Sequence, residues 1–378
     1  MASTAAELER IRAEVRRALA DFLRQQRAAC VDASLLPCLD AVDELLAAGK
    51  RLRPAFCYWG WRAAGGEDCP QIFTAAAALE LLHACALVHD DVLDASDTRR
   101  GRPSVHRRFA GRHEAAGWQG SADAFGTGAA ILIGDMLLAW TDELFHGSGL
   151  PPAALQSGQG VLDAMRTEVF SGQYLDLVGQ ASGAATAASA LRVVVYKSAK
   201  YTVERPLHLG AALAAGAARG AASDPAGTAT GPAGRRQRAG GGDGLPAAFS
   251  SYGIPLGIAF QLRDDILGVF GDPAQTGKPV SDDLREGKGT VLIAIARERA
   301  SAVQAVKIDR HLGDPLLSEQ AAAEIRAVIT ETGALEKCEL MIDSNVEEAL
   351  SALDEAAVTA PARDALADLA LAATARRD

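Results

Sequence analysis

Residues 89–106 read HDDVLDASDTRRGRPSVH and place a group of acids a few positions before a group of bases. If the apolar run before them is helical, Asp90 and Asp94 lie about 40° apart around the helix axis, and Asp91 lies about 100° from Asp90. Three carboxylates so placed repel one another and lie at the wrong end of the helix dipole. Clustered carboxylate oxygens suit Mg²⁺, which keeps several waters and bridges to phosphate oxygens. The acidic group therefore predicts a magnesium site, with a solvated helix end as the alternative.

Basic side chains follow these acids directly. The three arginines are Arg99, Arg100 and Arg102. Their planar guanidinium groups match the geometry of phosphate oxygens. Acids that hold Mg²⁺ beside arginines that hold phosphate predict a diphosphate-binding site.

A second apolar helix is predicted to end in the same way. Residues 260–290 read FQLRDDILGVFGDPAQTGKPVSDDLREGKGT, with Asp264 and Asp265 at the end of the apolar run. The charged residues that follow are Asp272, Lys278, Asp282, Asp283 and Lys288. Two apolar helices that both end in Asp-Asp and both precede basic residues are difficult to attribute to chance. They predict that the two segments share one site.

A third segment, GKRLRP at residues 49–54, adds Lys50, Arg51 and Arg53 on otherwise apolar ground. Alone, such a cluster is more often a charged helix end. Beside the two acidic segments it predicts a second anion pocket.

The elements that must position these residues are helices, because Ala- and Leu-rich runs recur along the chain and two-residue alternation does not. We expect helices over 72–94, 124–145, 155–177 and 188–216 (kinked at Pro206), and again from Phe249 through a segment at about 316–376. Residues 218–246 are rich in Gly, Ala and Pro and predict a flexible surface insertion. The prediction is an all-α fold, with a single domain over residues 1–378 that carries one insertion.

The composition limits the classes of function. The chain has 378 residues, of which 49% are hydrophobic and 23% charged, as in a globular protein. A net charge of −10 argues against nonspecific nucleic-acid binding, which needs a basic surface. Six scattered cysteines without a CxxC pair predict a reducing compartment. No signal-peptide core and no run of eighteen uninterrupted apolar residues is found, so we expect a cytoplasmic protein without a stable membrane anchor.

In these motifs the chain resembles the trans-isoprenyl diphosphate synthases, also called the polyprenyl synthetase family. The motif sequences are most similar to those of bacterial geranylgeranyl diphosphate synthases. The motifs that follow the family's order between about residues 40 and 300 are GKRLRP, DDVLD with RRGRPSVH, GQYLDL (172–177), YKSAKYT (196–202), and FQLRDDILGVFGD with TGKP and DDLREGK. The resemblance implies an isoprenoid-synthase-type helical bundle around a central cavity, completed by C-terminal helices.

The resemblance also implies roles for individual residues. The implied magnesium ligands are Asp90, Asp91, Asp94, Asp264 and Asp265. The implied contacts of the allylic diphosphate are Arg99 and Lys197, with Lys278 nearby. The implied contacts of isopentenyl diphosphate, which needs no metal, are Lys50, Arg53, His83 and Arg100. Polar residues implied to line the reaction centre are Gln173 and Gln261. The substrates would be isopentenyl diphosphate and dimethylallyl, geranyl or farnesyl diphosphate, with two or three Mg²⁺ ions and a homodimeric assembly.

The sequence departs from the family pattern in three ways. The second motif ends in Gly268, where the family usually has a third aspartate. YKSAKYT has Ser198 where the family commonly has threonine, and either Lys197 or Lys200 can be the equivalent lysine. The long insertion has no counterpart. A reduced metal site or a noncatalytic modulating subunit is therefore an alternative, although the intact first motif favours catalysis.

The implied reaction is an ionisation followed by an alkylation, in which Mg²⁺ and arginines stabilise the leaving diphosphate of the allylic substrate. If the growing chain runs down the helix that carries Asp90, Ala86 and Cys85 lie about 6 Å below the metal site. One turn further lie Leu82 and Leu81. Cys85 and Ala86 are small, which disfavours a C10 or C15 product. We expect C20 geranylgeranyl diphosphate, with a product of C25 or longer as the alternative.

A class I terpene cyclase would share the α-fold and one aspartate-rich motif. It would be expected to have an NDxxSxxxE-like second motif and would not need GKRLRP, so it suits this sequence less well. The helix predicted over 124–138 is rich in small residues and is a candidate dimer contact.

Overall fold

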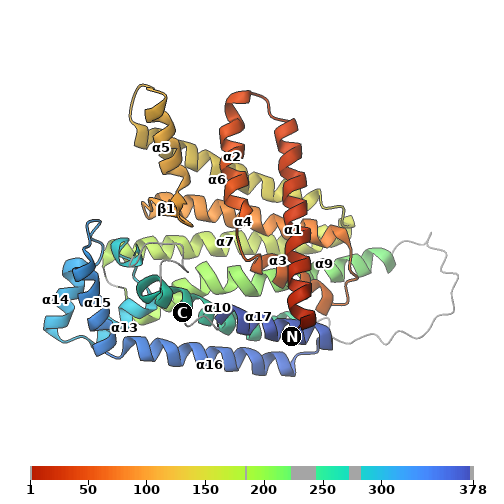
Figure 1. Ribbon diagram of the computed structural model, residues 1–378. Helices are drawn as coiled ribbons and strands as arrows, with labels where there is room; N and C mark the ends of the chain where they lie inside the picture. Colours follow the sequence, from red (N-terminus) through yellow and green to blue (C-terminus); the bar gives the residue numbers. More distant parts are fainter. Residues whose placement is uncertain (1, 184, 223–243, 272–281, 375–378) are drawn as a thin grey trace.

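The computed structural model describes residues 2–183, 185–222, 244–271 and 282–374. The predicted all-α fold is confirmed (Figure 1). The helices of the N-terminal half are α1 (Ala2–Ala28), the 3₁₀ helix η1 (Ala33–Leu35), α2 (Leu36–Ala47), α3 (Leu52–Ala63), α4 (Pro70–Leu93), α5 (Val105–Ala115), α6 (Ala122–His146) and α7 (Pro152–Ser182). Those that follow are α8 (Ala187–Val193), the π-helix η2 (Val194–Glu204), α9 (Arg205–Ala222), α10 (Leu245–Phe270), α12 (Asp282–Arg285), α13 (Val291–Arg299), α14 (Ala302–His311), α15 (Glu319–Glu331), α16 (Ala334–Glu355) and α17 (Ala360–Thr374).

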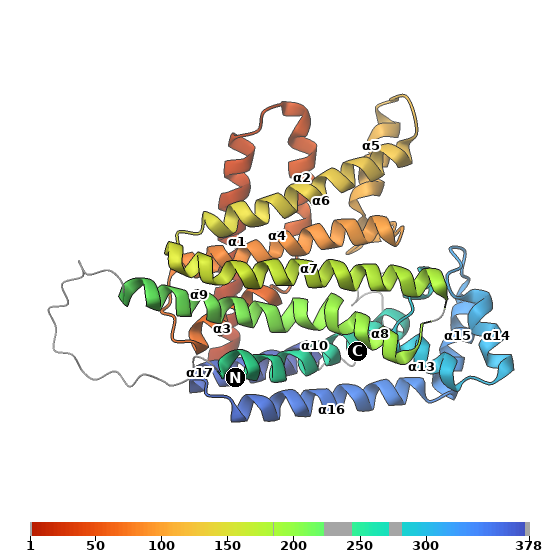
Figure 2. The same cartoon turned by 180° about the vertical axis from the view of Figure 1, so that it is seen from behind.

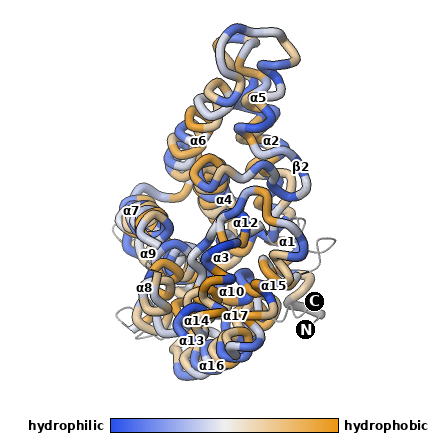
Figure 3. Tube along the Cα trace, turned by 90° about the vertical axis from the view of Figure 1, so that its left-hand side faces the viewer, coloured by the Kyte–Doolittle hydropathy of each residue, from blue (hydrophilic) through white to orange (hydrophobic). Residues whose placement is uncertain are grey.

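The long helices form stacked layers. In Figure 1 and in the reverse view of Figure 2, α4, α7, α10 and α16 lie across the molecule one beneath another, and α1 and α2 run across this direction and both contact α4. Seen end-on, α4, α7 and α10 surround the middle of the bundle (Figure 3). The two helices that carry the aspartate pairs, α4 and α10, therefore belong to the central layers, although α10 continues beyond Asp265 to Phe270 and does not end at the aspartates as expected.

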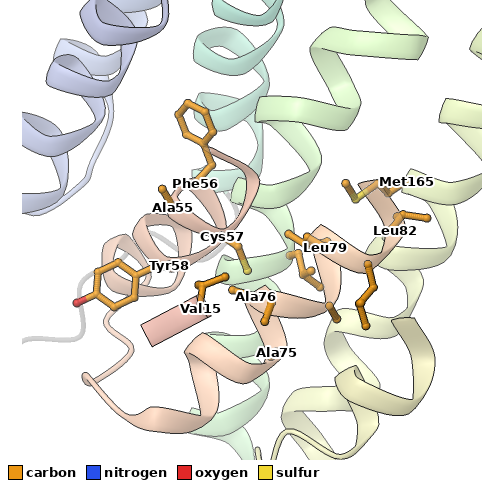
Figure 4. Packing of buried hydrophobic residues seen from close by; sticks show 14 of the residues in the cluster. Val15, Ala55, Phe56, Cys57, Tyr58, Ala75, Ala76, Leu79, Leu82 and Met165 are labelled. Atoms are coloured by element: carbon orange, nitrogen blue, oxygen red, sulfur yellow. The ribbon is translucent and has the colours of Figure 1, made fainter. Parts of the chain in front are cut away.

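The helix that carries the first aspartates, α4, is a core helix. It begins at Pro70, whose missing N–H costs nothing in the first turn of a helix. Its Ala- and Leu-rich sequence favours helix and buries most of its residues. Figure 4 shows Leu79 and Leu82 of α4 packed near Cys57 of α3 and Met165 of α7. This burial fixes the direction in which the end of α4 points.

A second core cluster lies around α10. It joins residues of α8, α10, α13, α15 and α16, and includes Leu262 and Ile266 on α10. Leu262 and Ile266 lie one turn apart on the packed side of α10, so Asp264 is exposed on another side, whereas Asp265 is buried.

Glycines let three helices approach closely around η2. A Cβ at Gly172 on α7 would lie 2.5 Å from the backbone nitrogen of Lys197, and one at Gly257 on α10 would overlap the backbone of Ala199. Any larger residue at either position would push η2 away. The two glycines therefore set the position of Lys197.

The structure differs from the sequence prediction in local features. A two-residue hairpin, β1 (Thr98–Arg99) paired with β2 (Arg102–Pro103), interrupts the helices and is too short to have an alternating pattern. Just before Pro206, where a kink was expected, the chain forms the π-helix η2, and α9 begins at Arg205. Of the insertion expected over 218–246, the first residues complete α9 and the last begin α10, while 223–243 lie outside the described residues.

Two helices are long and apolar enough to cross a membrane by length and composition, namely α4 and α6. The apolar window of α4 is 72% buried inside the protein, whereas that of α6 is 33% buried. The length and composition of α4 thus reflect its place in the core, and α6 leaves part of an apolar face uncovered.

Candidate active site

One cavity collects most of the residues that the sequence singles out. It has a volume of about 440 Å³ and lies among α3, α4, α7, η2 and α10. The predicted residues that line it are Lys50, Arg53, His83, Ala86, Asp90, Arg99, Arg100, Gln173, Lys197, Gln261, Asp264 and Asp265. Segments far apart in the sequence therefore meet at one site.

The end of α4 carries the first acidic group. Lys197 Nζ donates to Asp90 Oδ1 at 3.1 Å and to Asp176 Oδ2 at 2.8 Å. Arg99 Nε donates to Asp91 Oδ1 at 2.8 Å. One lysine and one arginine thus partly neutralise the first two acids of the motif, and both reach α4 from other segments.

The surroundings separate the pKa values of these acids. Burial alone would raise the pKa of Asp90, but the positive charges of Lys197 and Lys288 outweigh it and hold this pKa below its usual value. Burial raises the pKa of Asp91, and it raises the pKa of Asp94 to about 6. Of the three, Asp94 is the least stabilised as a carboxylate.

Asp94 is a buried carboxylate that lacks hydrogen bonds. Its side chain is 1% exposed, and neither oxygen accepts a hydrogen bond from the part of the chain that the structure describes. The ammonium of Lys288 lies 3.3 Å from Asp94 Oδ2 and 3.4 Å from Asp283 Oδ1. A buried carboxylate is costly unless charge and hydrogen bonds compensate it. Asp94 is thus suited to a bound cation.

The second acidic group lies on α10, in another wall of the same cavity. Gln261 Nε2 donates to Asp265 Oδ1 at 2.8 Å, and Ser198 Oγ donates to Gln261 Oε1 at 2.6 Å. Burial raises the pKa of Asp265 to about 8. Ser198, which departs from the family pattern, therefore orients Gln261 and through it Asp265.

These donors fit magnesium. Among the described residues, no three His, Cys, Asp or Glu side chains form a ready-made metal site. Mg²⁺ is usually held by one or two carboxylates together with substrate phosphates and waters, so a complete protein cage is not needed. Asp90, Asp94, Asp264 and Asp265 would hold it, since burial raises the pKa of Asp94 and Asp265 in spite of the nearby Lys288 and a divalent cation would supply further positive charge.

The basic side of the cavity comes from α3, α4 and the β1–β2 hairpin. The guanidinium of Arg53 lies 4.3 Å from the centroid of the Tyr201 ring, a cation–π contact that fixes its direction. Burial, with the nearby charges of Arg53 and Arg100, holds the pKa of His83 well below its usual value, so His83 is neutral. Lys50 lies at the exposed rim. The wall combines cationic side chains with one neutral hydrogen-bonding ring.

Arg51 of GKRLRP has a structural role, unlike Lys50 and Arg53 of the same motif. Its guanidinium is 3% exposed and pairs with the equally buried Glu80. It also donates to the carbonyl of Leu46, and its backbone is left-handed with φ 55°. Arg100 Nη1 donates to the carbonyl of Ala48 at 2.9 Å. These contacts hold the loop before α3 and so position Lys50.

The structure separates the two lysines of YKSAKYT. Lys197 lines the cavity, whereas Lys200 Nζ donates to Glu168 Oε1 at 2.8 Å. Glu168 also accepts from Arg205 Nε at 2.7 Å. Lys200 thus belongs to an ion-pair cluster between α7 and η2, and Lys197 is the lysine of the site.

The two residues expected at the cavity floor point in different directions. Ala86 lines the cavity, but Cys85 does not. Cys85 Sγ lies 3.9 Å from His89 Nδ1, and His89 contacts the carbonyl of Ile131 on α6. One residue along a helix turns the side chain by about 100°, so Cys85 faces α6, and its role in product length stays a prediction.

Sequence reasoning missed several residues of the site. Asp176 and Tyr201 lie within motifs that it quoted, and Asp283 and Lys288 follow the second aspartate pair; all four line the cavity. Only their position within or next to the motifs could have indicated them, because the sequence does not show which side chains they contact. Lys278 lies outside the described residues.

Comparison with known proteins identifies the class to which this fold and site belong. The sequence profile of the polyprenyl synthetase family matches residues 37–233 and 238–330. The chain belongs to the polyprenyl synthetase family, and it is an isoprenyl diphosphate synthase, a prenyltransferase.

Individual relatives agree with this assignment. The geranylfarnesyl diphosphate synthase of Aeropyrum pernix is 31% identical over 85% of this chain and 88% of its own length. The geranylgeranyl diphosphate synthase of Methanosarcina mazei is 30% identical over 82% of this chain and 80% of its own. A crystal structure of geranylgeranyl pyrophosphate synthase from Corynebacterium glutamicum, complexed with isoprenyl diphosphate and magnesium, is similar with a TM-score of 0.88 and 39% identity, covering 98% of this chain and 99% of that one.

Proposed function

We propose that the chain condenses isopentenyl diphosphate with an allylic diphosphate and releases geranylgeranyl diphosphate (C20). The observation that carries this proposal is that acids of both motifs, Asp90 on α4 and Asp264 and Asp265 on α10, line one cavity together with a basic wall and apolar side chains. The apolar lining residues are Ala86, Leu87, Val169, Val193, Val194 and Phe260. Charge for two diphosphates beside space for a hydrocarbon is what the reaction needs.

The two diphosphates would bind on different walls. Asp90, Asp94, Asp264 and Asp265 would hold two or three Mg²⁺ ions, with Asp91 held by Arg99 beside them. Bound Mg²⁺ would supply positive charge to the leaving diphosphate. Arg99 and Lys197 donate hydrogen bonds to the acids now and would donate to the allylic diphosphate once cations replace them there.

Isopentenyl diphosphate would bind to the basic wall without a metal. Arg53, held over Tyr201, and Arg100, held by backbone carbonyls, would present guanidinium groups to its phosphates. His83 is neutral and would add a hydrogen bond without raising the charge. Lys50 would close the pocket from the rim. Lys278, which lies outside the described residues, is proposed for the allylic diphosphate on its motif alone.

The reaction needs a dry pocket more than a protein nucleophile. The carbocation formed from the allylic substrate would be surrounded by apolar side chains that exclude water, which would otherwise convert it to an alcohol. Gln173 and Gln261 line the same space and would orient the reacting ends. The proton lost after alkylation would go to the released diphosphate, so no side-chain base is assigned.

The small Ala86 at the cavity supports a product longer than C15. C25 or longer is the alternative, since one relative is named a geranylfarnesyl diphosphate synthase. The polyprenyl synthetase match argues against a terpene cyclase. A noncatalytic modulating subunit is disfavoured because acids of both groups, Asp90 from the first and Asp264 and Asp265 from the second, line the cavity.

We further propose that the chain acts as a cytoplasmic homodimer built on a single polyprenyl synthetase domain. On α6, the large apolar residues Phe125, Ile131 and Leu132 are 38%, 44% and 65% exposed. A second copy that covered this face would remove apolar surface from water. Light scattering of the wild type and of Leu132→Glu tests the assembly, which should change from a dimer to a monomer.

A product assay tests the proposed activity. Purified protein, Mg²⁺, labelled isopentenyl diphosphate and each of dimethylallyl, geranyl and farnesyl diphosphate are incubated, and chain lengths are read by chromatography. A dominant C20 product is expected. A product of C25 or longer would change the assigned length, and no elongation from any primer would point to a modulating subunit.

A further inference from the structure

The space beside Gly268 is filled by another residue's carboxylate. Gly268 lies one turn after Asp264 on α10, on the same side of the helix. A Cβ built at Gly268 would overlap Asp283 Oδ2 and lie 2.8 Å from its Cγ. The carboxylate of Asp283 therefore occupies the place of a side chain at residue 268.

The surroundings of Asp283 are those of the second acidic group. Asp283 comes from the short helix α12 and lines the cavity together with Asp264 and Asp265. Lys288 Nζ lies 3.4 Å from Asp283 Oδ1 and 3.3 Å from Asp94 Oδ2, so one ammonium contacts acids of both groups. After burial, the negative charge of Asp283 is a further cause that raises the pKa of Asp265. The carboxylates of Asp264, Asp265 and Asp283 therefore lie in one electrostatic environment.

We propose that Asp283 supplies the third carboxylate of the second acidic motif, and that a glycine at residue 268 is required to admit it. The third carboxylate thus comes from residue 283 on α12 and not from residue 268 on α10. The proposal rests on the magnesium site of the proposed function and deepens it for this chain. Gly268 is then a steric requirement of the metal site and no sign that the site is reduced.

Substitutions at residues 268 and 283 should therefore have linked effects on metal binding. Gly268→Ala adds only a methyl group and favours helix, so it should not unfold α10. It should nevertheless displace Asp283 and weaken metal binding as much as Asp283→Ala does. Gly268→Asp should also displace Asp283. Gly268→Asp combined with Asp283→Ala has room for the new carboxylate and should recover binding.

Binding of Mn²⁺ to the purified protein in the presence of inorganic diphosphate, followed by electron paramagnetic resonance, measures this directly. Gly268→Ala and Asp283→Ala should each lower Mn²⁺ affinity by about 10- to 100-fold, the usual effect of losing a residue that supports a metal. Their combination should be no worse than either alone, because both remove the same carboxylate. The swapped pair should return to within a few-fold of the wild type.

Two control variants separate the outcomes. Ser251→Asp adds one negative charge at an exposed position of α10 and should leave Mn²⁺ binding unchanged. Asp90→Ala removes a ligand of the proposed site and should weaken binding. If Asp90→Ala weakens binding while the variants at 268 and 283 bind like the wild type, the role of Asp283 is overturned and the proposed function stands. The same follows if the swapped pair binds no better than Asp283→Ala. If Asp90→Ala has no effect, the proposed metal site itself is wrong.

Discussion

Widening the floor of the cavity should lengthen the product. Ala86 on α4 and Val169 on α7 line the cavity. Leu82 and Met165 lie four residues earlier on these helices, about 6 Å further along nearly the same faces. Both are fully buried in one core cluster, and Figure 4 draws them near each other. They form the surface that a growing chain would meet.

Leu82→Ala should therefore open about one further turn of depth. One turn, about 5.4 Å, is close to the length of an isoprene unit, so the main product should grow by about one C5 unit. Loss of a buried leucine lowers the free energy of unfolding by roughly 2–5 kcal/mol, so the assay is run well below the unfolding midpoint. Labelled isopentenyl diphosphate and farnesyl diphosphate are the substrates, and chromatography gives the product lengths.

Leu81→Ala is the matched control. Leu81 is also fully buried on α4, but it points about 100° away from Leu82. It should cost similar stability and leave the product length unchanged. The reasoning is refuted if Leu82→Ala makes products of wild-type length, or if Leu81→Ala lengthens them equally.

Three further predictions follow from the site. Glu80→Gln leaves the guanidinium of Arg51 buried without its counter-charge, which should lower the free energy of unfolding by about 3–5 kcal/mol in urea titrations. Lys197→Ala should raise the KM for the allylic diphosphate roughly 10- to 100-fold through loss of a charge-assisted hydrogen bond, whereas Lys200→Ala should leave that KM unchanged in steady-state kinetics. The pKa of Asp265 is about 8 when folded and about 3.9 when unfolded, so the folded state binds the extra proton and the free energy of unfolding falls as pH rises from about 4 through 8. Thermal melts in EDTA should show a smaller fall for Asp265→Asn, and an equal fall would contradict the burial of this acid.

The central helices could be predicted because their sequences are long, apolar and rich in helix formers. The aspartates at the end of α4 could be predicted as cation ligands. Their mutual repulsion and the helix dipole both disfavour carboxylates at this position unless a cation is bound. Their grouping with α10 followed from the repeated Asp-Asp pattern. What a pattern cannot give is the direction of a side chain on a fully buried helix. Cys85 and Ala86 are both small, and the sequence does not show that Cys85 faces His89 and α6 while Ala86 faces the cavity.

Features that depend on contacts between distant segments also escaped the sequence. The sequence suggested that the second motif lacks its third acid at Gly268. The order of residues does not show that the carboxylate of Asp283 occupies the space beside Gly268. Pro206 predicted a kink, whereas the closely packed Gly172 and Gly257 accompany a π-helix just before it. Arg51 read as an anion-binding residue, although its buried partner Glu80 makes it structural.

One cavity is proposed to hold two diphosphates, only one of them through metal. Equilibrium binding of isopentenyl diphosphate, measured by calorimetry in EDTA, tests this most directly when wild type, Arg53→Ala and Asp90→Ala are compared. Wild type and Asp90→Ala should bind isopentenyl diphosphate alike without metal, and Arg53→Ala should lose this binding. Loss of binding in Asp90→Ala, or full binding in Arg53→Ala, would contradict a metal-independent diphosphate site on the basic wall.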